Sequence, residues 1–120
     1  MARFLIVDDS KIARNFLRTV LEEAGHEIVA EASNGLEGFD MFVLHNPDVA
    51  TIDLTMPIVG GIDCLKNIIA KFPDAKTIIV SSVGKDSVIA EALKIGAKHV
   101  LRKPFEKETA LKVIDAVLDK

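Results

Sequence analysis

Acidic, hydroxyl and ammonium side chains stand directly after short apolar segments of this sequence. They are Asp8, Asp9, Asp53, Ser81, Ser82 and Lys103. Carboxylates are hard oxygen ligands for a divalent cation such as Mg²⁺, which binds through one or two of them together with waters and phosphate oxygens. A carboxylate beside such a cation can also attack phosphorus and form an aspartyl phosphate. These residue types therefore point to a metal-dependent phosphoryl site.

Each group has a possible role in that chemistry. Asp8 and Asp9 could hold the metal while Asp53 attacks the phosphorus. The charge that develops on the phosphoryl oxygens needs a hydroxyl or amide donor and a cation, and Ser81 and Lys103 supply both types. Taken singly, Asp9 could instead be a helix cap, Asp53 a turn residue and Lys103 a surface charge. The elements that carry these residues decide between the two interpretations.

Two hydrophobic patterns alternate along the chain. Short apolar runs predict strands over residues 4–7, 27–32, 48–53, 77–82 and 98–102. Helical spacing of apolar residues predicts helices over residues 13–24, 36–44, 62–72, 88–95 and from 111 to the C-terminus. Asp9 or Ser10 is available to cap the first helix, and Gly25 to end it. Strand–helix units with short connections predict one α/β domain with a parallel sheet covered on both faces.

The predicted topology brings the acids together. In an open parallel sheet, ligands bind beyond the carboxyl ends of the strands, and Asp8, Asp9 and Asp53 would meet at that edge. Two like charges about 4 Å apart repel by roughly 4 kcal/mol at an effective dielectric constant near 20, a large share of the stability of a small domain. A divalent cation is the natural compensation, so the topology favours the metal interpretation.

Composition excludes several other classes of protein. The 120 residues include 15 Lys and Arg against 18 Asp and Glu, a net charge of −3 that disfavours nucleic-acid binding through bulk charge. The single Cys64 rules out an internal disulfide and a thiolate zinc site, and it fits a reducing compartment. No apolar run approaches the length of a membrane span. We therefore expect a cytoplasmic protein without membrane insertion.

Three short motifs, taken in order, resemble a known family. Leu5-Ile-Val-Asp-Asp9, Asp53-Leu-Thr-Met-Pro57 with Gly60-Gly61, and Lys103-Pro104-Phe105 are similar to the motifs of bacterial response-regulator receiver domains, in particular the stand-alone CheY-like kind. The resemblance covers the whole chain and implies one receiver domain over residues 1–120. It also implies a doubly wound five-stranded parallel sheet of order 2-1-3-4-5 with five helices, and a cis Lys103–Pro104 bond.

The resemblance assigns the metal site and the phosphoacceptor. It implies that Asp53 accepts a phosphoryl group from the phosphohistidine of a histidine kinase. It also implies that Asp8, Asp9 and Asp53 bind Mg²⁺, helped by the backbone carbonyl of Thr55. Such a domain catalyses its own phosphorylation and dephosphorylation but is not an enzyme acting on an external substrate.

The switch residues follow from the same resemblance, with departures. Ser81 would be the hydroxyl that moves toward the phosphoryl group, Lys103 its ionic partner, and Ser82 a small residue that leaves the donor access. Many members carry Tyr or Phe on the fifth strand as a second switch residue, but this sequence has Val100 there and no Tyr or Trp. Aromatic rotation at that position cannot be its switch. Thr55 and Val83 lie at positions where the family varies and tunes dephosphorylation.

The expected partners are proteins. We expect a histidine kinase as phosphodonor and a downstream protein that binds the face of the fourth helix, fifth strand and fifth helix, with the chain itself a monomer. A basic run near that face is either a solvated surface or a docking patch for an acidic segment; it comprises Lys85, Lys94, Lys98 and Arg102. The pathway expected is chemotaxis, and the alternatives are a phosphorelay intermediate or a receiver excised from a larger regulator.

Other functions have weaker support. A magnesium-dependent phosphohydrolase usually needs a second acid two residues after its nucleophile, where this chain has Thr55. An interaction domain that keeps only the fold would not need the complete set of acids, hydroxyl and lysine. Gly84-Lys85-Asp86 lacks the first glycine and the Ser or Thr of a P-loop. The three histidines lack metal spacing and are expected at the surface, and Cys64 is expected in the core; the histidines are His26, His45 and His99.

Overall fold

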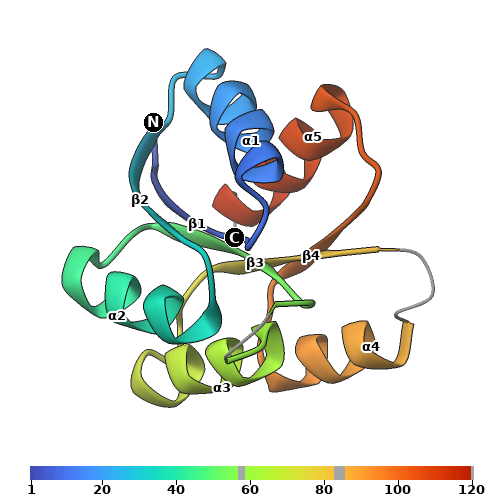
Figure 1. The fold of residues 1–120 in the computed structure, drawn as a ribbon. Helices are drawn as coiled ribbons and strands as arrows, with labels where there is room; N and C mark the ends of the chain where they lie inside the picture. The colour runs from blue at the N-terminus through green and yellow to red at the C-terminus, as the bar shows by residue number, and fades with distance from the viewer. Residues whose placement is uncertain (57–58, 83–85, 120) are drawn as a thin grey trace.

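In the computed structural model, five strands alternate with five helices over the described residues, which are 1–56, 59–82 and 86–119 (Figure 1). The strands are β1 (Arg3–Val7), β2 (Glu27–Ala32), β3 (Val49–Asp53), β4 (Thr77–Ser81) and β5 (His99–Arg102). The helices are α1 (Lys11–Glu23), α2 (Gly35–His45), α3 (Gly61–Lys71), α4 (Asp86–Ile95) and α5 (Lys107–Leu118). All strands pair in parallel in the order β2-β1-β3-β4-β5. The expected α/β fold and strand order are confirmed.

Two hydrophobic cores lie on opposite faces of the sheet. α1 and α5 cover one face, and α2, α3 and α4 cover the other (Figure 1). Successive residues of a strand point to opposite faces, so Phe4 and Ile6 of β1 pack in the first core while Leu5 and Val7 pack in the second. Burial on both faces explains why β1 reads as a continuous apolar run rather than an alternating one.

Several helices begin earlier than the apolar pattern predicts, because their first turns are polar. Of the two predicted caps of α1, Asp9 and Ser10, the structure has Ser10. The side chain of Asn34 caps α2, so the helix begins at Gly35. α5 begins at Lys107 rather than Leu111, since its first three residues are polar and exposed, and the small Ala110 is the first apolar residue of the helix.

β3 occupies the centre of the sheet. It pairs with β1 on one side and β4 on the other, and all five of its residues are buried. Asp53 is its last residue, so this carboxylate emerges at the carboxyl edge of the strand. Lys103 follows β5 at the same edge, and the Lys103–Pro104 peptide bond is cis, as the resemblance implies.

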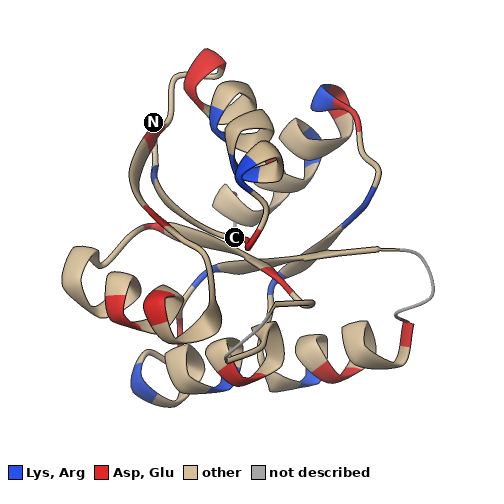
Figure 2. Ribbon diagram, viewed as in Figure 1, with Lys and Arg blue, Asp and Glu red and all other residues tan. Residues whose placement is uncertain are grey.

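Charged residues are concentrated on the helices and at the sheet edge. Figure 2 shows acidic residues where β1 and β3 end, and basic residues on the neighbouring α1. The edge at which β1 and β3 end therefore carries the candidate site.

The helices within the described ranges all fall short of the length and apolar character needed to cross a bilayer.

Candidate functional site

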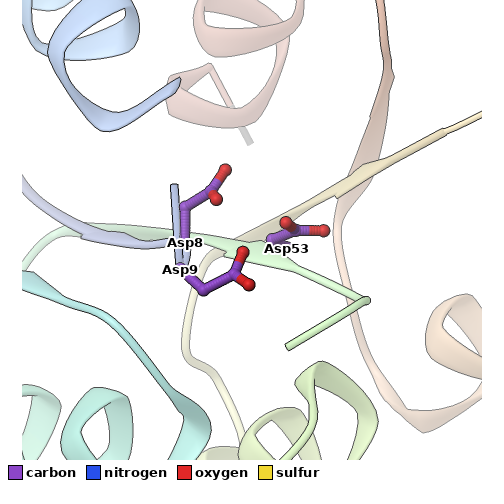
Figure 3. A group of neighbouring side chains, drawn as sticks. All are labelled: Asp8, Asp9 and Asp53. Carbon is purple, nitrogen blue, oxygen red and sulfur yellow. The ribbon is translucent and has the colours of Figure 1, made fainter. Parts of the chain in front are cut away.

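Three carboxylates gather where β1 and β3 end (Figure 3). Asp8 and Asp9 follow β1, Asp53 ends β3, and one ligand oxygen from each lies within 4.8 Å of the others. Asp8 is 6% exposed and Asp53 7% exposed, whereas Asp9 is open to solvent. The cluster thus has two buried acids at its base and one at its mouth, and the structure brings together the acids that the sequence predicted there.

Lys103 joins the two buried acids. Its Nζ atom lies 3.1 Å from Oδ2 of Asp8 and 3.5 Å from Oδ2 of Asp53. Its backbone N–H donates to the carbonyl of Ser81 at 2.6 Å, which fixes the chain after β5 against the end of β4. Burial is the largest single influence on the pKa of Lys103 and acts to lower it, but Asp53 and Asp8 outweigh burial and raise the pKa overall. The lysine therefore stays charged.

The environment of Asp53 disfavours its ionised form. Burial and the neighbouring Asp8 raise the pKa of Asp53, with burial the larger influence. The backbone N–H of Thr55 donates to its Oδ1 at 3.1 Å, and this bond and Lys103 act in the opposite direction. A cation beside this carboxylate would relieve the repulsion from Asp8.

Ser81 and Thr55 flank Asp53. Ser81 is 1% exposed, and its hydroxyl is directed toward the carbonyl of Ser82 at the long distance of 3.4 Å rather than toward an acid. Thr55 is exposed, and its carbonyl accepts no hydrogen bond from the described residues. Both groups therefore have a polar atom available for a ligand.

Glycines let the backbone close tightly at Asp53 and at the segment before α3. A Cβ on Gly61 would overlap the carbonyl oxygen of Asp53 and come within 2.6 Å of Cα of Leu54. Gly35 donates its N–H to the carbonyl of Val59 at 2.7 Å and leaves equally little room for a side chain. Gly61 is part of the Gly60-Gly61 pair quoted above, but its close approach to Asp53 has no signal in the sequence, where eight positions separate the two residues.

Arg14 is a residue at this site that the sequence analysis missed. Its Nη1 donates to the backbone carbonyl of Asp8 at 2.7 Å, and its Nε donates to Glu31 at 3.0 Å. The carboxylate of Asp8 also has a local contact, since the N–H of Ser10 donates to its Oδ1 at 2.9 Å. The only signal in the sequence was an arginine one helical turn after the cap Ser10.

The donor set suits a divalent metal cation. Three carboxylates beside one ammonium leave two negative charges, which a doubly charged cation would balance. The donors are hard oxygens, and Asp9 is accessible from solvent. The acidic cluster could therefore hold a metal ion.

Comparison with known proteins agrees with this geometry. The family model described as "Response regulator receiver domain" matches residues 4–115. The chain belongs to the response regulator receiver domain family. This membership makes it a phosphoacceptor signalling protein rather than an enzyme acting on an external substrate, which disfavours the phosphohydrolase alternative.

The relatives of this receiver domain include proteins named "Chemotaxis protein CheY". That of Listeria monocytogenes is 37% identical over 115 residues, which cover 96% of this chain and 97% of that protein. That of Thermotoga maritima is 38% identical over 115 residues and 96% of each chain. A chain in the CheX–CheY–BeF3–Mg²⁺ complex from Borrelia burgdorferi matches with a TM-score of 0.94 and 33% identity, over 98% of this chain and 90% of that chain.

The remaining predicted features of the receiver domain have mixed outcomes. The Cys64 side chain is fully buried, and burial raises the pKa of its thiol to about 12, so its core placement is confirmed. The three histidines are partly buried rather than at the surface, and His26 packs on Phe4. In the predicted basic run, Arg102 pairs with Asp86 at 2.9 Å. Three other predicted residues lie outside the described ranges: Pro57, Val83 and Lys85.

Proposed function

We propose that Asp53 is the phosphoacceptor of this receiver domain. An oxygen of its carboxylate forms a bond to phosphorus as the N–P bond of a phosphohistidine on a histidine kinase breaks, and the electron pair returns to the imidazole nitrogen. Asp53 is suited to this role because it ends the central strand, is nearly buried, and is held by the N–H of Thr55. Asp9 lies at the open mouth of the same cluster, which leaves a direction from which the donor can approach.

Mg²⁺ is the proposed cofactor. Asp8, Asp9 and Asp53 would hold it together with the backbone carbonyl of Thr55, and its chemistry when bound is to offset charge on the phosphoryl oxygens. The support for this choice is the two uncompensated negative charges of an all-oxygen donor set. The similar CheX–CheY–BeF3–Mg²⁺ complex from Borrelia burgdorferi also agrees with this choice.

Ser81 and Lys103 are proposed to bind the phosphoryl oxygens. The Lys103 ammonium already lies within 3.5 Å of the Asp53 carboxylate. The long bond from the Ser81 hydroxyl to the Ser82 carbonyl is easily exchanged for a shorter bond to a phosphoryl oxygen. Ser82 is exposed and small, which leaves room for the donor. Because Val100 stands where many members carry an aromatic residue, the proposed switch is the Ser81 hydroxyl alone.

We propose that the whole chain, residues 1–120, is one receiver domain that acts in cytoplasmic chemotaxis signalling as a monomer. The support is the group of relatives named CheY, which match almost end to end. The proposed output is a phosphorylation-dependent contact between the face formed by α4, β5 and α5 and a downstream protein. The basic component of that face within the described residues includes Lys94 and Arg102.

A single arrangement carries the proposal: the Lys103 ammonium between the carboxylates of Asp8 and Asp53. It is tested by incubating the protein with a small acyl phosphate and Mg²⁺ and measuring the intact mass. One added phosphoryl group is expected, and it should be absent in Asp53→Asn and when a chelator is present.

The matched control is Asp40→Asn, which removes an exposed carboxylate on α2 that is not part of the cluster. This variant should be labelled like wild type. Labelling that persists in Asp53→Asn, or a phosphoryl group mapped to a Ser, Thr or His, would overturn the assignment of Asp53.

A further inference from the structure

Arg14 links the acidic cluster to the edge strand of the sheet. It lies in the first part of α1, and its side chain is 16% exposed. One arm of its guanidinium donates to the backbone carbonyl of Asp8 at 2.7 Å, and Nε donates to Glu31 on β2 at 3.0 Å. A guanidinium presents several donors in a rigid plane, so both contacts can form at once. The side chain thus spans from β2 to the end of β1.

The bond to Asp8 fixes the peptide that joins the two acids after β1. The N–H of Asp8 donates to the carbonyl of Ala32 at 3.0 Å, and the Asp8 carboxylate accepts the N–H of Ser10. Asp9, in contrast, makes no hydrogen bond of its own with the described residues. The carbonyl held by Arg14 belongs to the peptide that leads into Asp9, so Arg14 restricts the orientation in which the Asp9 carboxylate enters the cluster.

Glu31 holds Arg14 in place. Glu31 also accepts a hydrogen bond from Nε of Arg18 at 2.8 Å, so two arginines of α1 converge on one carboxylate. These contacts lower the pKa of Glu31, although burial, the largest single influence, acts in the opposite direction. Arg18 makes no contact with Asp8 among its bonds, which instead go to Glu31 and Glu22. The two arginines therefore share an anchor but differ in whether they reach the site.

We propose that Arg14 is a positioning residue that sets the affinity of the acidic cluster for a divalent cation by orienting the peptide between Asp8 and Asp9. This inference rests on the proposed metal site. Groups that orient metal ligands without touching the metal commonly change its affinity. The neutral Arg14–Glu31 pair acts through geometry, since its charges cancel next to the cluster.

The test compares Arg14→Met with Arg18→Met. Both variants keep an apolar stem and remove a partner of Glu31, but only Arg14→Met removes the bond to Asp8. Mg²⁺ binding is measured by titration calorimetry, because the chain has no Trp or Tyr to report binding by fluorescence. The dissociation constant is expected to rise about tenfold in Arg14→Met, as for other residues that orient metal ligands, and to stay near the wild-type value in Arg18→Met.

A second measurement separates positioning from a general loss of structure. The rate of labelling by an acyl phosphate is followed against Mg²⁺ concentration. In Arg14→Met the half-saturating Mg²⁺ concentration should rise while the maximal rate stays close to wild type. If Arg14→Met does not fold, Arg14→Lys serves instead: its single ammonium can satisfy Asp8 or Glu31 but not both, so an intermediate dissociation constant is expected.

Three outcomes would overturn a proposal, and they are distinguishable. Unchanged Mg²⁺ affinity in the Arg14 variants would remove the positioning role and leave the metal site intact. Equal loss of affinity in Arg14→Met and Arg18→Met would assign the effect to the shared Glu31 anchor rather than to the Asp8 carbonyl. A wild-type protein that does not bind Mg²⁺ would overturn the proposed metal site and, with it, this inference.

Discussion

The ammonium of Lys103 lies 3.1 Å from the carboxylate of Asp8, although 95 positions separate the two residues along the chain. The contact joins the end of β1 to the segment after β5, across the end of β3 that carries Asp53. It means that the candidate site is assembled only when most of the sheet has formed. The Lys103 ammonium therefore already neutralises part of the negative charge of the carboxylates that a bound metal ion would also neutralise.

Replacing Lys103 separates its two effects on the site. In Lys103→Met we expect Mg²⁺ to bind severalfold more tightly, because a competing positive charge is removed. Phosphorylation by an acyl phosphate should nevertheless slow by about a hundredfold, because a cation that stabilises charge on the phosphoryl oxygens is lost. Calorimetry and the rate of mass labelling measure the two quantities. Lys107→Met, which breaks an exposed pair with Glu23, is the control and should change neither.

Gly61 is expected to be irreplaceable where its neighbour Gly60 is not. A Cβ at Gly61 would overlap the carbonyl of Asp53, so Gly61→Ala should lower the free energy of unfolding by about 2 kcal/mol and slow phosphorylation. At Gly60, the carbonyl oxygen of Met56 is the nearest atom to a new Cβ within the described part of the chain, at 3.9 Å, so Gly60→Ala should change both quantities little. Chemical denaturation and labelling rates test this. Similar losses in both variants would mean that the loop, rather than the approach to Asp53, is sensitive.

Thr77 offers a stabilising substitution. Among the described residues, its hydroxyl is the buried side-chain polar atom that has no hydrogen-bond partner. Thr77→Val has a similar shape and removes the unsatisfied group, so the free energy of unfolding should rise by about 1 kcal/mol. Thr77→Ser keeps the hydroxyl and loses a methyl group, so it should destabilise the protein. A destabilised Thr77→Val variant in chemical denaturation would show that the hydroxyl has a partner.

His26 should make stability depend on pH. Its Nδ1 accepts the N–H of Ala2 at 3.0 Å, which requires an unprotonated nitrogen, and burial followed by the charge of the N-terminus lowers its pKa from 6.5. The unfolded chain therefore binds the proton more readily than the folded one. The contribution of His26 to the free energy of unfolding is expected to be complete above pH about 6.5. It should be lost progressively as the pH drops from there toward the lower pKa of the folded state.

Denaturation curves across this pH range measure the effect. The fall should be reduced in His26→Gln and kept in His45→Gln, since the His45 side chain makes no hydrogen bond within the described residues. An unchanged slope in His26→Gln would assign the dependence to another group.

The architecture was predictable because local pattern and topology agree. Each strand buried on both faces reads as an apolar run, and β2 has the residues 27–32 that the pattern predicts. The strand order came from the resemblance rather than from periodicity. The first three residues of α5 are polar, which is why its start at Lys107 was missed.

The sequence was sufficient to predict which residues of the candidate site stand at the ends of strands. Asp8, Asp9 and Asp53 follow strands whose carboxyl ends share an edge, so topology alone brings them together. Arg14 was not predictable, because its contact is with a backbone carbonyl and depends on the direction of a side chain from α1. The overlap at Gly61 likewise depends on how closely α3 approaches β3.

The central position of β3 determines which parts of the molecule can respond to a change at Asp53. β3 is hydrogen-bonded on both sides and buried throughout, so its amides should be among the slowest to exchange with deuterium. β5 has four residues, is paired on one side, and buries only Leu101 completely. A new charge at the end of β3 would therefore change the conformation mainly at the periphery of the sheet. The middle of the sheet would stay in place.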